Sequence, residues 1–497
     1  MSLCFRRLHG APRLFPRIIR RAVATEARAT EATFLESQED EPLRPAIASS
    51  TSAPKNTGLK VHEYLDKSYK IGGRLELGVD PLDRHNVQDV PKWGPWGVPL
   101  KLQEAGITTV TTASNFWLRD NCRCEKCVNQ DTMQRAFDTF SINPDIMPKE
   151  VITEKDGLKI TWADDGHVSK YGWDWLIKHR SNPSAAHFHK KGDNLNKQTL
   201  WGSEIASDPP SVHYDEIIAS DKGVGEWTEK IRQYGFCYVD GCPTSPERTQ
   251  SLLERIAFIR VTHYGIFLPI CHGILLTLLG GFYDFTADLT MKDTAYTNLA
   301  LPAHTDTTYF TDPAGLQMFH CLSHTGGSGG ISLLVDGFNA AHILRKESPS
   351  AYDILARMPI SWHASGNEGI TITPAKKMPV LNFQEVGEKK IPTLMQVRWN
   401  NDDRGVVALE QHQGMSAEKW YAAARKWNDI LRRSEMEYWA KLKPGQPLIF
   451  DNWRVLHGRS AFTGKRRICG GYINHDDYIS RWRNTNFSRE EVLEQIL

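Results

Sequence analysis

Alternating apolar and polar positions mark short β-strands along much of the chain. A period of two is typical of strands that bury one face and expose the other. The alternation is clearest at residues 158–162, and further strand-like runs lie at residues 107–112, 315–322, 332–335 and 448–457. Glycine-rich turns separate many of them, so the pattern predicts a protein that is mainly β.

Helical spacing of apolar positions is rarer and is clearest over residues 417–436. Trp420, Trp427 and Leu431 recur there at intervals that place them on one helical face. A few such helices among many short strands favour a β-sandwich decorated by helices.

Residues 1–28 have the composition of a mitochondrial transit peptide. Arginines stand there among small and apolar residues, and no acidic residue occurs before Glu26. A basic amphipathic helix of this kind is typical of an import sequence. We therefore expect the protein in the mitochondrial matrix, with a disordered basic tail as the alternative.

Polar segments divide the rest of the chain. Residues 29–57 are rich in Ala, Ser, Thr, Glu and Pro, which predicts a disordered linker. Residues 58–180 are interpreted as a small β-rich domain, and residues 181–210 as a second linker. The large remaining domain covers residues 211–497.

An apolar, uncharged run at residues 266–280 interrupts the large domain. It is shorter than the roughly 20 residues that a membrane-spanning helix needs, and it contains Pro and Gly. The run therefore predicts a buried segment and no membrane span.

Charge and cysteine content indicate the class of ligand and the redox compartment. The 497 residues carry 60 Lys and Arg against 59 Asp and Glu, which disfavours a nucleic-acid partner and favours a small-molecule ligand. Nine cysteines are too few for a disulfide framework in so long a chain. The sequence thus indicates a reducing compartment.

Three of the cysteines are clustered. Cys122, Cys124 and Cys127 lie within one tight turn, a spacing that can aim three thiolates at one zinc ion. His167, in a turn after the strand at 158–162, is the preferred fourth ligand. A closed four-ligand site has no vacancy for substrate, so we predict a structural zinc. The competing histidines are His85, His187 and His189.

A second metal site is predicted at His304 and Asp306. An H-x-D triplet supplies two ligands of the 2-His-1-carboxylate triad of non-haem Fe(II) oxygenases. The chain also contains such triplets at 213–215 and 475–477. The first is preferred because strand-like segments follow it and His457 ends a distant apolar strand, which supplies the third ligand.

Arg466 follows the distal histidine. A guanidinium can bind a carboxylate through two parallel hydrogen bonds. We expect Arg466, helped by the Ser332 hydroxyl, to hold the far carboxylate of 2-oxoglutarate. A solvated charge is the alternative interpretation.

With these residues in view, the sequence resembles the 2-oxoglutarate-dependent dioxygenases of carnitine biosynthesis over about residues 58–497. The resemblance implies a double-stranded β-helix (jelly-roll) catalytic domain beside a small β-rich zinc-binding domain. It also implies iron at His304, Asp306 and His457, 2-oxoglutarate at Arg466, ascorbate as a cofactor, and His167 as the fourth zinc ligand. The segments that carry the resemblance are 115–122, 293–297, 304–310, 333–338 and 450–459.

The resemblance further implies a trimethylammonium substrate in an aromatic cage, because a quaternary ammonium is recognised through cation–π attraction. Asp293 would pair with the α-ammonium of trimethyllysine, hydroxylated at carbon 3; the γ-butyrobetaine branch has a neutral amide there. Hydroxylation of γ-butyrobetaine is one alternative, a non-catalytic trimethyllysine-binding module is another, and a homodimer stays open. The tyrosines at the cage positions are Tyr264, Tyr283, Tyr296 and Tyr472.

The run at 266–280 departs from the family. Relatives pass directly from the position of Tyr264-Gly265 to that of Gly281-Phe282-Tyr283, so that two residues of one cage lie close together in sequence. Removing the run restores the family register, so we interpret it as a translated intron, with a genuine insertion as the alternative.

Overall fold

The computed structural model describes residues 93–104, 107–179, 198–262, 281–286, 297–366, 369–386, 391–409 and 412–496. None of the helices within these ranges has the length and apolar character to cross a membrane. Several predictions lie outside the described residues: the transit peptide at 1–28, the linker at 29–57, the run at 266–280, and the side chains Tyr264, Asp293 and Tyr296.

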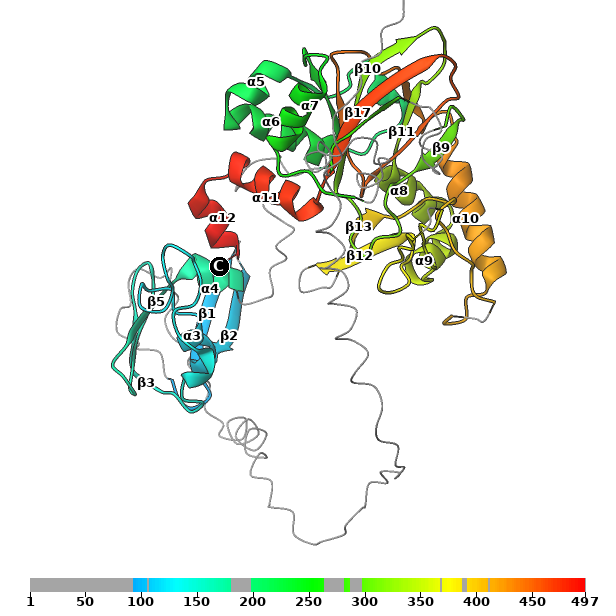
Figure 1. Cartoon of the computed structure of the whole chain (residues 1–497). Helices are drawn as coiled ribbons and strands as arrows, with labels where there is room; N and C mark the ends of the chain where they lie inside the picture. The colour runs from blue at the N-terminus through cyan, green and yellow to red at the C-terminus, as the bar shows by residue number, and fades with distance from the viewer. Residues whose placement is uncertain are drawn as a thin grey trace, which may run out of the picture. The chain divides into compact units, whose positions relative to one another are not determined.

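The N-terminal domain is a small β-rich unit. Its antiparallel sheet contains β3 (Pro148–Thr153), β4 (Gly157–Trp162) and β5 (Val168–Gly172), shown in cyan and green in Figure 1. A hairpin of β1 (Val98–Glu104) and β2 (Ile107–Ala113) and the helices α3 (Asn115–Asp120) and α4 (Trp173–His179) complete it. Leu118, Ile160 and Trp162 are buried in its core, and β2 and β4 coincide with two of the strands predicted from sequence.

The large domain contains two sheets. The six-stranded sheet has the order β6-β7-β15-β10-β17-β8, and the four-stranded sheet has the order β14-β11-β16-β9. Leu334 and Val455 of the smaller sheet share one buried cluster with Phe236, Phe450 and Ile468 of the larger sheet, so the two sheets enclose a common core. The first sheet contains β6 (Ser211–His213), β7 (Phe236–Asp240), β15 (Leu448–Asp451), β10 (Leu316–Thr325), β17 (Lys465–Ile473) and β8 (Tyr283–Thr286). The second contains β14 (Tyr438–Ala440), β11 (Ser332–Asp336), β16 (Val455–Arg459) and β9 (Leu301–His304).

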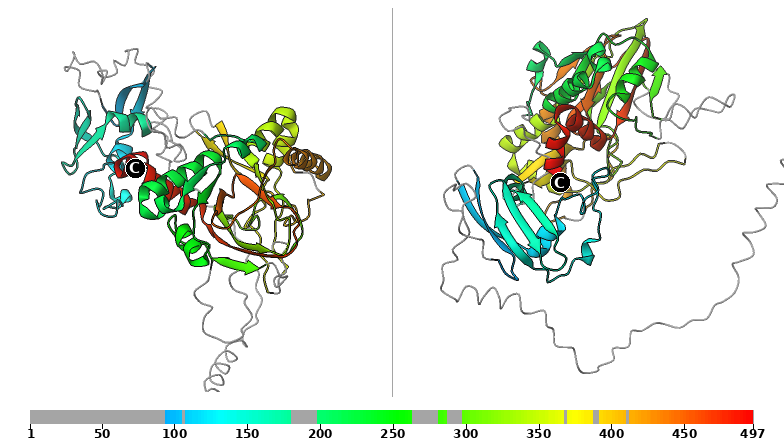
Figure 2. Two further views of the ribbon diagram at one scale, coloured as in Figure 1. Left: turned by 90° about the horizontal axis from the view of Figure 1, so that it is seen from above. Right: turned by 90° about the vertical axis from the view of Figure 1, so that its left-hand side faces the viewer.

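Helices cover the outer faces of both sheets (Figure 1 and Figure 2). Leu316 and Met318 of β10 pack outward with Trp227 and Trp482, whereas Gln317 between them points to the inner face, as alternation requires. The helices on this side are α5 (Tyr214–Ala219), α6 (Asp221–Tyr234), α7 (Pro246–Glu254), α11 (His475–Asn486) and α12 (Arg489–Ile496). The other sheet is covered by α8 (Gly337–Glu347), α9 (Pro349–Arg357), α10 (Ala417–Leu431) and the hairpin of β12 (Leu381–Val386) and β13 (Ile391–Val397).

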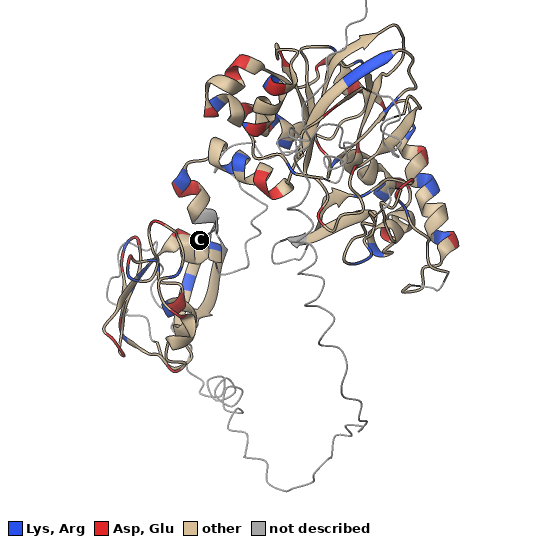
Figure 3. Ribbon diagram, in the orientation of Figure 1, with Lys and Arg blue, Asp and Glu red and all other residues tan. Residues whose placement is uncertain are grey.

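The helix predicted at 417–436 is present as α10, which ends at Leu431. Basic and acidic side chains both occur along α6, α10 and α11 (Figure 3).

Part of the segment predicted as a linker is packed into the large domain. Trp201 is 1% exposed, and its backbone N–H donates to Asp336 Oδ2 over 3.2 Å. Arg454 pairs with Asp336 at 2.8 Å and also donates to the carbonyl of Thr199. A buried ion pair requires such full hydrogen bonding, so residues 198–202 are held by the core. Packing of the large domain thus begins upstream of residue 211.

Candidate functional site

Two histidines face each other at one end of the four-stranded sheet. His304 on β9 and His457 on β16 are direct partners in the antiparallel register, and their ring centroids are 4.3 Å apart. Nδ1 of His304 lies 2.8 Å from the carbonyl of Pro302. A proton on Nδ1 satisfies that carbonyl and leaves the Nε2 lone pair for a metal.

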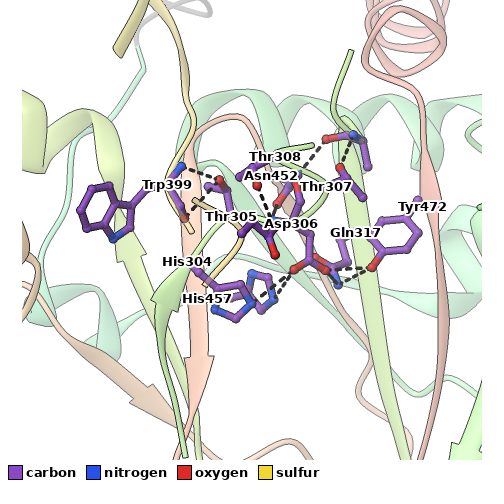
Figure 4. Close-up of polar contacts among 12 residues, drawn as sticks. His304, Thr305, Asp306, Thr307, Thr308, Gln317, Trp399, Asn452, His457 and Tyr472 are labelled. Carbon is purple, nitrogen blue, oxygen red and sulfur yellow. Dashed lines mark hydrogen bonds and ion pairs between the residues drawn. The ribbon is translucent and has the colours of Figure 1, made fainter. Parts of the chain in front are cut away.

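Asp306 reaches the same point from the turn after β9. Its N–H donates to Asn452 Oδ1 over 2.7 Å, and Asn452 donates back to the Asp306 carbonyl over 3.0 Å. Thr307 follows with φ +57°, a left-handed conformation rare for a β-branched residue, and its hydroxyl accepts the N–H of Ala314. Asn452 and Thr307 thus fix the turn that presents the carboxylate (Figure 4).

The three side chains converge as metal ligands do. Asp306 Oδ1 lies 3.3 Å from His304 Nε2 and 3.7 Å from His457 Nε2. One carboxylate oxygen and two imidazole nitrogens at such distances match the 2-His-1-carboxylate donor set of non-haem iron. The residues present therefore fit an Fe(II) ion.

The two competing triplets do not form such groups in the described part of the chain. His213 and Asp215 are exposed, and they pair only with each other at 3.7 Å. His475 is stacked on Trp453 with a centroid distance of 3.9 Å, and its side chain is 11% exposed. Clustered metal-type donors occur in the described residues at two places, the His304 group and the Cys122 group.

The second oxygen of Asp306 is bound by the six-stranded sheet. Oδ2 accepts hydrogen bonds from Gln317 Nε2 at 2.7 Å and from the Tyr472 hydroxyl at 2.8 Å. Gln317 on β10 and Tyr472 on β17 are direct partners in the register of that sheet. Sequence reasoning missed Gln317, because nothing in its local pattern distinguishes it from any inward polar residue.

Burial and charge set the protonation of the triad. Burial, followed by the neighbouring His304, lowers the pKa of His457 to about 3. Burial also acts to lower the pKa of His304, but the hydrogen bond and the charge of Asp306, together with the Pro302 carbonyl and Asp403, outweigh it and raise the pKa above its usual value. For Asp306, burial acts upward, yet the two imidazoles hold the pKa of the carboxyl well below its usual range. The Asp306 carboxylate is therefore an anion that faces the two imidazole rings.

A cavity of about 430 Å³ opens from the triad. Arg466 and Ser332, predicted to bind 2-oxoglutarate, both line it, as do Tyr283 and Tyr472. Arg466 is 8% exposed; it contacts the Cys321 thiol and lies 5.7 Å from the Phe462 ring centroid. No described carboxylate neutralises this buried guanidinium, which suits an anionic ligand.

The cavity has further polar walls that sequence reasoning did not identify. His363, Asp402 and Asp403 line it, and Asp403 accepts the hydroxyl of Thr308 over 2.7 Å. They follow no motif with a recognised spacing, and only the fold brings them to the triad.

The cysteine cluster is the second metal-type group. His167 Nε2 lies 3.3 Å from Cys122 Sγ, 3.6 Å from Cys124 Sγ and 3.4 Å from Cys127 Sγ. Tetrahedral zinc with ordinary bond lengths places sulfur and nitrogen about 3.5 Å apart, so the geometry fits this ion. Gly166, with φ +68°, makes the β4–β5 turn that carries His167. Arg119 donates to Cys127 Sγ over 3.3 Å.

Two sheets around a common core, with facing histidines and an H-x-D carboxylate at one end, define a non-haem iron oxygenase. Comparisons with known proteins narrow the class. Residues 195–472 match the Taurine catabolism dioxygenase TauD, TfdA family, and residues 107–177 match the Gamma-butyrobetaine hydroxylase-like N-terminal family.

Trimethyllysine dioxygenase of Neurospora crassa is 53% identical over an alignment of 420 residues, which covers 78% of this chain and 83% of the relative. The mitochondrial trimethyllysine dioxygenase of Gallus gallus is 38% identical over 79% of this chain and 87% of its own length. Human gamma-butyrobetaine dioxygenase is 27% identical over 74% of this chain and 89% of its own length. The chain belongs to the trimethyllysine dioxygenase family of Fe(II)- and 2-oxoglutarate-dependent oxygenases.

Proposed function

We propose that this protein hydroxylates free N6,N6,N6-trimethyllysine at carbon 3, the first step of carnitine biosynthesis. Dioxygen and 2-oxoglutarate are consumed, and succinate and CO2 are formed. The observation that carries the proposal is 53% identity to a trimethyllysine dioxygenase in a chain that brings His304, Asp306 and His457 together. The lower identity to the γ-butyrobetaine enzyme, 27%, ranks that substrate second.

His304, Asp306 and His457 would hold the iron, which with 2-oxoglutarate supplies the oxidation of an unactivated C–H bond when bound. Arg466 would bind the far carboxylate of 2-oxoglutarate, and Ser332 would donate its hydroxyl to the same group. This contact orients the co-substrate and excludes water from the buried guanidinium. Ascorbate is the expected reductant in turnover.

Tyr283 and Tyr472 would form part of the aromatic cage. Their ring centroids are 5.8 Å apart in an edge-to-face arrangement. The Tyr283 hydroxyl donates to the Met318 carbonyl over 2.7 Å, and that of Tyr472 donates to Asp306. A trimethylammonium group cannot form conventional hydrogen bonds, so it needs only ring faces. Tyr264, Tyr296 and Asp293 would complete the substrate site.

Outside the active site, Cys122, Cys124, Cys127 and His167 would hold a structural zinc. Residues 1–28 would direct import to the mitochondrial matrix, where the name of the Gallus gallus relative places that protein. We also propose domain limits of 58–180 for the small domain and 211–497 for the large domain. The packing of Trp201 extends the large domain upstream of residue 211.

A direct assay tests the function. Purified protein is incubated with Fe(II), 2-oxoglutarate, ascorbate and either trimethyllysine or γ-butyrobetaine, and the products are analysed by mass spectrometry. We expect addition of one oxygen atom to trimethyllysine, at carbon 3 by NMR. Hydroxylation of γ-butyrobetaine alone would contradict the proposal.

A further inference from the structure

Each sheet presents one cross-strand pair of side chains to Asp306. The four-stranded sheet presents His304 and His457, which lie near Oδ1. The six-stranded sheet presents Gln317 and Tyr472, which donate to Oδ2. The carboxylate thus bridges the two sheets, with one oxygen for the proposed metal and the other for protein donors.

This arrangement decides how the carboxylate can bind a metal. A carboxylate has two equivalent oxygens and can use either or both of them. Two donors at 2.7 and 2.8 Å occupy Oδ2, and a rotation that turned both oxygens toward the metal would break both of these hydrogen bonds. Gln317 is 1% exposed and Tyr472 is 6% exposed, so water would replace those bonds poorly and the loss would be unfavourable. Oδ1 is therefore the oxygen left for the metal.

We propose that Tyr472 is a positioning residue that fixes Asp306 as a one-oxygen iron ligand, with Gln317 as its helper. Tyr472 also has a second role, in which its ring is a wall of the aromatic cage. Only this second role rests on the proposed function. One side chain then serves the iron ligand with its hydroxyl and the substrate cation with its ring.

The orientation of Gln317 supports the assignment. Its Nε2 faces Asp306, and its Oε1 is buried without a hydrogen-bond partner among the described residues. Reversing the amide would place Oε1 against the carboxylate, which is repulsive. The amide therefore gives its donor to Asp306 and leaves its acceptor unpaired, as expected if the Asp306 contact dominates.

Tyr472→Phe separates the two roles, because it keeps the ring and removes the hydroxyl. We expect Fe(II) affinity, measured by anaerobic titration of the metal-free protein, to fall about tenfold or more, the usual effect of losing a partner of a metal ligand. We also expect kcat to fall and more 2-oxoglutarate to be consumed per hydroxylated product, while the KM for trimethyllysine stays unchanged. Gln317→Leu should weaken iron binding in the same direction.

Tyr283→Phe is the matched control. It removes the hydroxyl of another tyrosine of the same cavity, but that hydroxyl is bound to Met318 and not to Asp306. Its Fe(II) affinity should equal that of the wild type, and thermal unfolding should show that all three variants are folded. Wild-type iron affinity in folded Tyr472→Phe would overturn the proposal.

The metal titration requires no substrate, which separates this inference from the function. If the wild type fails to hydroxylate trimethyllysine yet Tyr472→Phe loses iron, the positioning role stands and the proposed substrate is wrong. If Tyr472→Phe binds iron normally but raises the KM, the residue acts only in the cage and the positioning role is refuted.

Discussion

The rings of His304 and His457 lie 4.3 Å apart as direct partners between β9 and β16. Two imidazoles held this closely in a buried pair cannot both become charged without repulsion, which is one reason that the pKa of His457 is low. A metal ion at the proposed site would accept both Nε2 lone pairs and keep both rings neutral. The close pair therefore supports the proposed metal site.

Removing one triad ligand should abolish turnover without unfolding the protein. We expect His304→Ala and Asp306→Ala to lose all 2-oxoglutarate consumption, because two remaining ligands do not hold iron in the required geometry. Succinate release measures the loss, and zinc content and thermal unfolding serve as controls. Wild-type turnover in either folded variant would contradict the iron assignment.

The cysteine cluster should bind zinc for stability. Cys124→Ser is expected to lose zinc and to unfold at a lower temperature, because a structural site contributes its binding free energy to folding. Metal analysis and calorimetry check both effects. Arg119→Gln should weaken zinc retention against a chelator, because Arg119 donates to the Cys127 sulfur. Full zinc occupancy and unchanged stability in Cys124→Ser would show that the site is not structural.

His320 should make the protein less stable in acid. Its ring is 0% exposed; Nδ1 lies 2.7 Å from the Thr249 hydroxyl, and Nε2 accepts the Gly445 N–H. Since the Thr249 hydroxyl donates to Ser245, Nδ1 carries the proton, and a second proton on Nε2 would face a donor. Burial accordingly lowers the pKa of His320 to about 4.

The unfolded chain takes up this proton near pH 6.5 and the folded protein only near pH 4. The contribution of neutral His320 to the free energy of unfolding is therefore complete above about pH 6.5. It falls by about 2–3 kcal/mol as the pH drops toward about 4. Urea denaturation at several pH values measures the slope. His320→Gln should flatten it by up to one proton per molecule, and an unchanged slope would refute the assignment.

Most of the proposed metal ligands could be grouped from sequence because their signals are local. His304 and Asp306 are two positions apart, and Cys122, Cys124 and Cys127 span one turn. The distant His457 and His167 could be assigned only from the predicted strands beside them and from the family resemblance. Gln317 could not be predicted as a partner of Asp306, since its role depends on the register between β10 and β17. Trp201 looked like part of a polar linker because its burial depends on Asp336, 135 positions away.

The run at 266–280 should be removable. A methyl group built on Gly281 would lie 2.7 Å from the carbonyl oxygen of Arg260, so the chain on the two sides of the run is already in contact. Closing a loop whose ends meet requires little rearrangement. We expect the deletion of residues 266–280 to retain or improve folding and turnover, as measured by calorimetry and succinate release.

The mature transcript checks the same hypothesis independently. Absence of the corresponding codons would identify a translated intron. Their presence, together with loss of folding in the deletion variant, would make the run a genuine structural insertion.

Substrate choice should depend on a carboxylate away from the cage. Trimethyllysine and γ-butyrobetaine present the same trimethylammonium group, so Tyr283 and Tyr472 cannot distinguish them. Trimethyllysine adds an α-ammonium. If Asp293 pairs with that ammonium in a site closed to water, leaving the carboxylate unpaired would cost about 1–3 kcal/mol, or about a 5- to 150-fold preference. We expect trimethyllysine to be preferred by this range and Asp293→Asn to erode the preference, chiefly by weakening trimethyllysine.

Asp402→Asn is the matched comparison, because Asp402 is a second acidic residue lining the cavity. Competition assays with both substrates give the ratio of kcat/KM for each variant. Loss of the preference in Asp293→Asn but not in Asp402→Asn would assign the discrimination to Asp293. The opposite result would move the α-ammonium site to the 400–403 turn. Equal use of both substrates by the wild type would remove the physical case for a charged partner altogether, since an unpaired buried carboxylate must penalise the substrate that lacks the ammonium.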